Sequence, residues 1–202
     1  MMARTKTIKK ENFFSVNYKL SWDYLKETKK FIFFIIGIFF FFSLIGFFVP
    51  VPEQIRQEIL DIVKNLFEKT EGMNQLEMIN FIFLNNLKSS FFGLFLGIFF
   101  GIFPILSSLI NGYVLGFVAL LSVEENGFSV LWKLLPHGIF ELPAVFISLG
   151  MGLKFGTFLF KKNKKKKFFD IFFNSVRVFI FVVIPLLIIA AVIEGTLIII
   201  LG

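Results

Sequence analysis

The sequence contains no cysteine, a single histidine, and charged residues at only 17% of its positions. The absence of cysteine excludes a disulfide framework, a thiol nucleophile and a thiolate metal site. One histidine with scattered glutamates does not provide the dense ligand set of a catalytic zinc site. The chain also lacks a phosphate-binding Walker loop and a nucleophile elbow, which removes support for ATPase and serine hydrolase activities. We therefore expect a protein that is not an enzyme and that holds no metal and no cofactor.

One motif leaves an enzymatic alternative open. Residues 123–126 read "VEEN", and paired glutamates also occur in intramembrane proteases of the CAAX type. That family has an arginine four residues after the second glutamate, where this chain has Ser129, and it has further histidine motifs. Intramembrane hydrolysis is therefore the weakest of the functional alternatives, and only the detection of bound metal would support it.

What the chain has in abundance is apolar surface. Of its 202 residues, 56% are hydrophobic and 33 are phenylalanine, which is more than a soluble domain of this size can bury. Several uncharged runs reach about 20 residues, the length of a helix that crosses the bilayer core. The sequence therefore predicts an all-α integral membrane protein that crosses the cell membrane several times.

The basic residues support this interpretation. The net charge is +7, and the lysines flank the apolar runs, above all in "KKNKKKK" at residues 161–167. Such placement indicates membrane topology and anionic headgroups rather than nucleic acid. Lys154 and Arg177 lie near the expected inner helix ends, from which their side chains can reach the headgroups. We expect the lysine run to be a solvated loop, and a patch for a cytoplasmic partner is the alternative.

The first helix and its flanks follow from prolines and periodicity. Residues 1–30 form a basic cytoplasmic tail, in which Ser21 is expected to cap a short helix that makes an elbow at the membrane surface. Pro50 and Pro52 end the first apolar run, 31–49. Apolar residues at helical spacing over 53–71 predict an amphipathic helix on the extracytoplasmic side.

The number of crossings depends on residues 91–123, which carry no charge. A single straight helix of this length would measure about 50 Å, against about 30 Å of hydrocarbon core. Two crossings place the basic tail and the lysine run on the same, cytoplasmic side, and Pro104 supplies the break between them. We therefore predict one membrane domain over 31–202, with the N-terminus inside and the C-terminus outside. Its five spans are 31–49, 77–104, 107–123, 136–158 and 172–197.

Small residues recur about every four positions in three of these spans, a spacing that lets helix backbones approach closely in lipid. The expected packing residues are Gly93, Gly97, Gly101, Gly112, Gly116, Ala144, Ser148 and Gly152. We expect them to pack the helices of one chain together, and an interface between two copies is the alternative.

Two ionisable residues lie on the same face as some of these small residues. The stretch "PHGIFELPA" at 136–144 places His137 and Glu141 one helical turn apart. An ionisable group inside a span is costly unless it is protonated or has a partner, so we expect both to be shielded from lipid and to contact other helices. Glu194 and Asn111 are the expected partners. This polar cluster has three interpretations: a structural clamp, a proton or ion relay, or a contact with a ligand or partner.

Three segments together resemble the stage II sporulation protein M family: "NNLKSSFFGLFLGIFFGIFPILSSLINGYVLG" (85–116), "PHGIFELPAVFISLGMGLKFG" (136–156) and "AAVIEGTL" (190–197). The resemblance puts family signature positions at Asn111, Gly112, His137, Gly138, Glu141, Pro143 and Glu194. It implies a polytopic membrane protein, and in spore formers the namesake acts as a membrane platform for peptidoglycan-degrading partners. We therefore expect a non-enzymatic scaffold or partner-recruiting platform in the cell envelope.

The alternative function is a proton-coupled or small-solute transporter that uses His137, Glu141 and Glu194. Five crossings are few for a transporter, so this function would require a homodimer. In both cases the expected partners are the lipid bilayer and other membrane or envelope proteins, and not nucleic acid.

Overall fold

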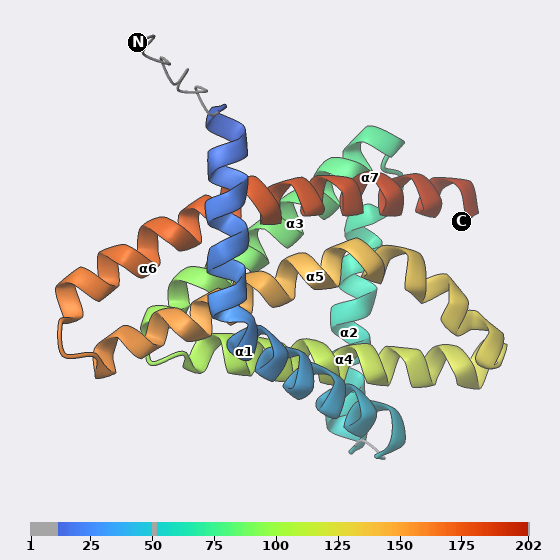
Figure 1. Cartoon of the computed structure of the whole chain (residues 1–202). Coiled ribbons are helices and arrows are strands. Elements are labelled where there is room, and N and C mark those ends of the chain that lie inside the picture. The colour runs from blue at the N-terminus through green and yellow to red at the C-terminus, as the bar shows by residue number, and fades with distance from the viewer. Residues whose placement is uncertain (1–11, 50–51, 202) are drawn as a thin grey trace, which may run out of the picture.

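The structure, a computed structural model, describes residues 12–49 and 52–201, without the side chains at 63, 66, 67, 132–137 and 201. Every regular element in these ranges is helical, as the sequence predicts (Figure 1). The elements are α1 (Phe13–Phe48), α2 (Glu53–Thr70), α3 (Gln75–Phe95), η1 (Leu96–Ile98), α4 (Ile102–Asn126), η2 (Phe128–Val130), α5 (Leu131–Gly156), η3 (Thr157–Phe160), α6 (Lys164–Val178), η4 (Phe179–Val183) and α7 (Ile184–Leu201).

Five helical stretches are long and apolar enough to span a membrane, which confirms the predicted number. They are Phe13–Phe48, Gln75–Ile98, Ile102–Asn126, Gly138–Phe160 and Lys164–Ile200. The last one joins α6, η4 and α7 into one continuous helix, in which η4 is a π-helical turn. Pro185 lies two residues after the end of this turn, and its missing N–H and bulky ring disturb the regular α-helical hydrogen bonding there.

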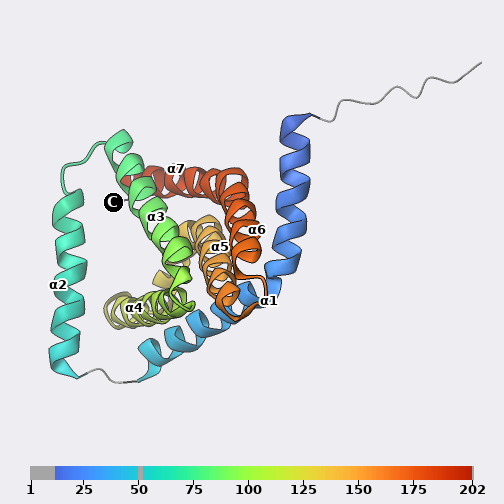
Figure 2. The same cartoon turned by 90° about the vertical axis from the view of Figure 1, so that its left-hand side faces the viewer.

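Helix α5 is the centre of the bundle. It packs against α1, α3, α4 and α7, which surround it in the view of Figure 2. Half of the residues in its most apolar stretch are buried, compared with a third or fewer in the other four spans. The interior around it contains fully buried Leu94, Ala144, Met151 and Leu187. The core is therefore built around the segment that carries the "HGIFELPA" motif.

Helix α1 begins earlier than the sequence analysis predicted. It starts at Phe13 and continues to Phe48, so Ser21 lies inside the helix, is buried, and is not a cap. The helix nevertheless bends near its middle (Figures 1 and 2). Its first half contacts η4 through the Phe13, Tyr18 and Phe181 rings. It contacts α6 through the hydrogen bond between the Tyr24 and Ser175 hydroxyls. An elbow is thus present, but tertiary packing forms it within a continuous helix.

The break between the second and third spans also differs from the predicted position. It falls at residues 99–101, where Phe100 and Gly101 adopt positive φ angles of 56° and 73°. The left-handed conformation reverses the chain, and glycine adopts it without strain. Pro104 does not supply the break, because it lies in the first turn of α4, where a backbone N–H has no helical partner.

Two other helix starts differ from the sequence analysis. Helix α5 begins at Leu131, so Pro136 lies beyond its first turn rather than at its first position. Gly127, at positive φ, ends α4, and the short η2 helix leads directly into α5, which therefore begins before Pro136. Helix α6 begins at Lys164, so the second part of the lysine run is helical and not a loop.

The predicted amphipathic helix corresponds to α2. It ends at Thr70, just before Gly72 at φ 76°. In Figure 2, α2 is separated from the bundle and lies on the side of α3 and α4. In Figure 1, its axis runs roughly perpendicular to α4, α5 and α7. This orientation suits a helix that lies in the plane of a membrane surface.

Candidate functional site

Small residues bring two pairs of helices into backbone contact. A Cβ atom on Gly97 would overlap the carbonyl of Gly152, which joins the end of α3 to α5. A Cβ atom on Gly112 would overlap the carbonyl of Phe39, and one on Gly116 that of Ser43, which joins α4 to α1. All eight of the expected packing residues are buried. In lipid, such close approach is a main source of helix association, so these contacts hold the bundle together.

Helices α3, α5 and α7 carry several of the buried polar residues of the interior. These three helices pack pairwise. Helix α3 contributes buried Asn86 and Ser90, and α5 contributes buried Ser148. Glu141 on α5 and Glu194 on α7 are half-buried, and each has an interaction partner. The two glutamates therefore lie on helices that touch, among other polar groups.

The other two residues of the predicted cluster, His137 and Asn111, are not shown beside the two glutamates. His137 lies on α5, but its side chain is outside the described residues. Asn111 lies in the middle of α4 with an exposed side chain, and its amide donates to the carbonyl (2.7 Å) and the hydroxyl (3.2 Å) of Ser107. The hydrogen bonds of Asn111 thus stay within its own helix.

The environment of Glu141 leads to a testable prediction. Replacement by leucine should lower the midpoint of thermal unfolding in detergent more than replacement by glutamine. Glutamine retains a hydrogen-bonding group, whereas leucine leaves polar neighbours unsatisfied at a cost of about 1–3 kcal/mol. Differential scanning fluorimetry of both variants measures this difference. Equal midpoints for the two variants would contradict a structural clamp at this position.

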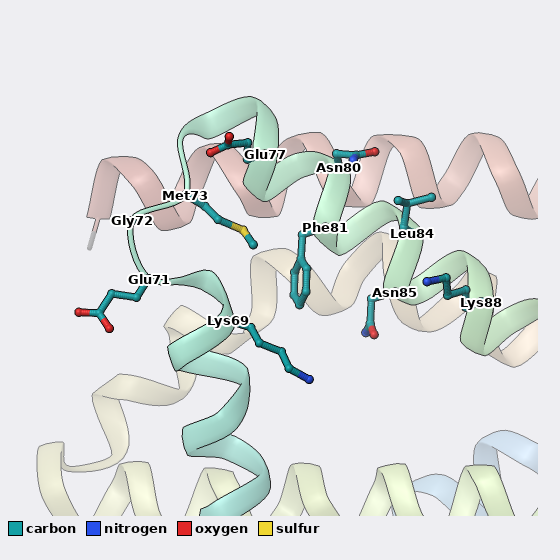
Figure 3. A pocket seen from close by; sticks show the side chains of 10 residues that line it. All are labelled: Lys69, Glu71, Gly72, Met73, Glu77, Asn80, Phe81, Leu84, Asn85 and Lys88. Carbon is teal, nitrogen blue, oxygen red and sulfur yellow. The ribbon is translucent and has the colours of Figure 1, made fainter.

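A polar groove lies between α2 and α3, away from the predicted cluster. It encloses about 620 Å³ between the end of α2, the following turn and the first half of α3 (Figure 3). In Figure 3, Lys69 points from α2 into this space, Asn85 points into it from α3, and Glu71 points away. The lining residues are Lys69, Glu71, Gly72, Met73, Glu77, Asn80, Phe81, Leu84, Asn85 and Lys88.

The α3 wall of this groove carries polar residues on a face turned away from the core. Asn80, Asn85 and Lys88 are all exposed, and they lie within the candidate span Gln75–Ile98. A lysine near the middle of a transmembrane helix costs roughly 2.5–3.5 kcal/mol on insertion scales. This face therefore requires water or a polar partner. This polar face was not predicted, although the spacing of its residues along one side of a helix can be recognised in the sequence.

A second polar cluster joins α1, α5 and α6. The Lys154 amino group lies 3.8 Å from the centre of the Tyr24 ring and donates to the Thr28 hydroxyl at 3.1 Å. It also forms an ion pair with Glu27 at 3.4 Å. The Tyr24 hydroxyl lies 3.1 Å from the Ser175 hydroxyl. Lys154, expected to reach toward headgroups, is instead largely buried, with 13% of its side chain exposed.

The family model described as stage II sporulation protein M matches residues 31–197. The match includes the small-residue contacts, the α2–α3 groove and the interface of α3, α5 and α7. No curated protein and no solved structure matches the chain.

Proposed function

The chain belongs to the stage II sporulation protein M family, and from this premise we propose that it is a non-enzymatic platform that recruits partner proteins in the cell envelope. In this proposal it is a multi-pass protein of the plasma membrane. The basic N-terminal tail and the lysine run lie in the cytoplasm, as the positive-inside rule favours. The C-terminus and α2 then lie on the outer side.

The observation that carries this proposal is the polar face of α3. Lys88, Asn80 and Asn85 are exposed on a helix whose length and apolarity suit a membrane span. Polar residues at such positions generally face a partner or a water-filled cavity rather than lipid. A second protein that packs along this face would satisfy them and would exclude lipid from the groove.

The chemistry of the groove defines the partner. Two lysines and two glutamates line it, but Glu71 points away and Glu77 accepts from the backbone N–H of Asn74. The groups left to meet a partner are the ammonium groups of Lys69 and Lys88 and the side-chain amides on α3, which donate and accept hydrogen bonds. A matching partner is a membrane helix or juxtamembrane segment that presents a carboxylate or free carbonyl groups to the lysines. The end of α2 would lie over this segment and hold it against α3.

Affinity purification with matched variants tests the proposal. The wild-type protein, the triple variant N80L/N85L/K88L and the control N111L are purified from their native membranes in mild detergent. Asn111 is an exposed amide outside the groove, so N111L makes an Asn-to-Leu change elsewhere on the protein. We expect the same partner with the wild type and N111L, and at least a tenfold loss with the triple variant. Retention of that partner by a folded triple variant would contradict the proposal.

A second candidate function is proton-coupled or small-solute transport, favoured by the half-buried Glu141 and Glu194 on touching helices. The packing nearby opposes an open pathway, because Leu149, Met151 and Leu187 are fully buried. Reconstituted vesicles with a pH-sensitive dye distinguish the two functions. Proton flux that is lost with E141Q would favour transport, and the absence of flux would favour the platform.

A further inference from the structure

A second cavity, of about 280 Å³, lies where α1, the end of α5 and the start of α6 meet. It is separate from the α2–α3 groove and shares no residue with it. Three lysines line it, Lys154, Lys161 and Lys167, together with the carboxylates of Glu27 and Asp170. The lining therefore carries one excess positive charge, which matches the single negative charge of a phosphate diester.

The three lysines are not equivalent. Lys154 is committed to Thr28, Glu27 and the Tyr24 ring within the protein. Lys167 reaches Asp170 only at 3.9 Å, and its side chain is 54% exposed. Lys161 is also exposed, at the end of η3. The amino groups of Lys161 and Lys167 are therefore the ones that can turn toward an anion at little cost.

The cavity also has an apolar wall that a free anion would not require. Phe31 and Ile171 line it, and Phe31 begins the uncharged run 31–49. Phe33 and Phe34 follow, with 67% and 55% of their surface exposed. The cavity thus lies at the boundary between the lysine-rich surface and the surface that suits acyl chains.

From this arrangement we propose that the cavity binds the headgroup of an anionic phospholipid of the phosphatidylglycerol type. Lys161 and Lys167 hold the phosphate by charge-assisted hydrogen bonds. Thr157, Asn174 and Asp170, which line the same cavity, hydrogen-bond the glycerol hydroxyls. The acyl chains leave along Phe31 toward the bilayer. This inference does not depend on the proposed recruitment of partners, because it concerns a lipid and a cavity that has no residue in common with the α2–α3 groove.

Native mass spectrometry of the full-length, delipidated protein in detergent tests the proposal. The probes are dioleoyl-phosphatidylglycerol, dioleoyl-phosphatidylcholine, inorganic phosphate and glycerol phosphate. The variant K161Q/K167Q removes the two lysines of the cavity, and the control K162Q/K165Q removes two lysines of the same run that do not line it. Both variants lose the same charge.

We expect one molecule of phosphatidylglycerol to bind the wild type and the control, and affinity to fall by about tenfold or more in K161Q/K167Q. Equal losses in the two variants would overturn the proposal, since they would indicate general attraction to the lysine run. Equal binding of phosphatidylcholine, or binding of glycerol phosphate as tight as that of the lipid, would also overturn it. If K161Q/K167Q unfolds more readily without lipid, the single change K161Q at an exposed residue provides the same comparison.

Discussion

Replacement of Gly116 with alanine is expected to lower the free energy of unfolding by about 1–3 kcal/mol. The added Cβ atom would overlap the carbonyl oxygen of Ser43, and the backbone N–H of Phe47 lies only 3.0 Å from it. Both obstacles are backbone atoms of α1, which cannot rotate away as a side chain can. Helices α1 and α4 must therefore move apart. Because they then lose close packing along their contact, the bundle becomes less stable. Reversible unfolding in mixed micelles, followed by circular dichroism, measures the change.

Gly37, on the exposed face of α1, provides the matched control. A Cβ atom on Gly37 meets nothing within 4 Å, and the residue is exposed on α1. Gly37→Ala should be neutral, or stabilising by about 0.5–1 kcal/mol, because alanine favours the helix. Equal destabilisation by Gly37→Ala and Gly116→Ala would show that general helix effects, and not backbone contact, explain the loss.

The second large effect is expected for Lys154→Glu, which should lower the free energy of unfolding by about 3 kcal/mol. The substitution places a carboxylate, largely shielded from water, against the face of the Tyr24 ring and close to Glu27. The ring face and Glu27 are both negative and repel the new charge, and Lys167, which lines the same cavity, offsets only part of this loss. Thermal and denaturant unfolding of the purified variant measure the loss.

Two further variants separate charge from packing at this position. Lys154→Met retains much of the side-chain volume without a charge and should cost far less than Lys154→Glu. Glu27 is 71% exposed, so Glu27→Lys alone should have a small effect. Combined with Lys154→Glu, it should restore part of the lost stability. If the double variant recovers none of the lost stability, the ion pair between Lys154 and Glu27 does not contribute to the stability of the fold.

The number of membrane spans and the helical class could be predicted because they depend on local properties. A membrane span requires an uncharged run of sufficient length, and that run is visible in the sequence. The amphipathic α2 helix was equally readable from the spacing of its apolar residues and the glycine that follows it.

The exact boundaries could not be predicted, because prolines act differently in different positions. Pro104 and Pro136 were interpreted as a break and a helix start, but each lies inside a helix. Pro104 lies in the first turn of α4, where a proline removes no hydrogen bond, so it does not mark the break by itself. The chain reverses at Gly101, because close packing of that glycine against Leu153 and its positive φ favour a turn there.

The polar sites depend on contacts between distant residues. The interaction of Tyr24 with Ser175 and that of Lys154 with Thr28 join segments more than 100 residues apart, and no local pattern indicates them. For Asn111, the sequence suggested a partner across helices, but its amide bonds to Ser107 one turn away. The polar face of α3 was readable, whereas the position of α2 beside it was not.

The central claim, that the α2–α3 groove receives another protein, is tested most directly by photo-crosslinking in intact cells. A photoreactive amino acid at Leu84, which lines the groove and is 40% exposed, is compared with one at Phe33, which is 67% exposed on α1. The account predicts a discrete adduct with a different protein at Leu84 and none at Phe33. The same adducts at both positions, or at Leu84 an adduct with lipid or a second copy of this chain alone, would contradict it.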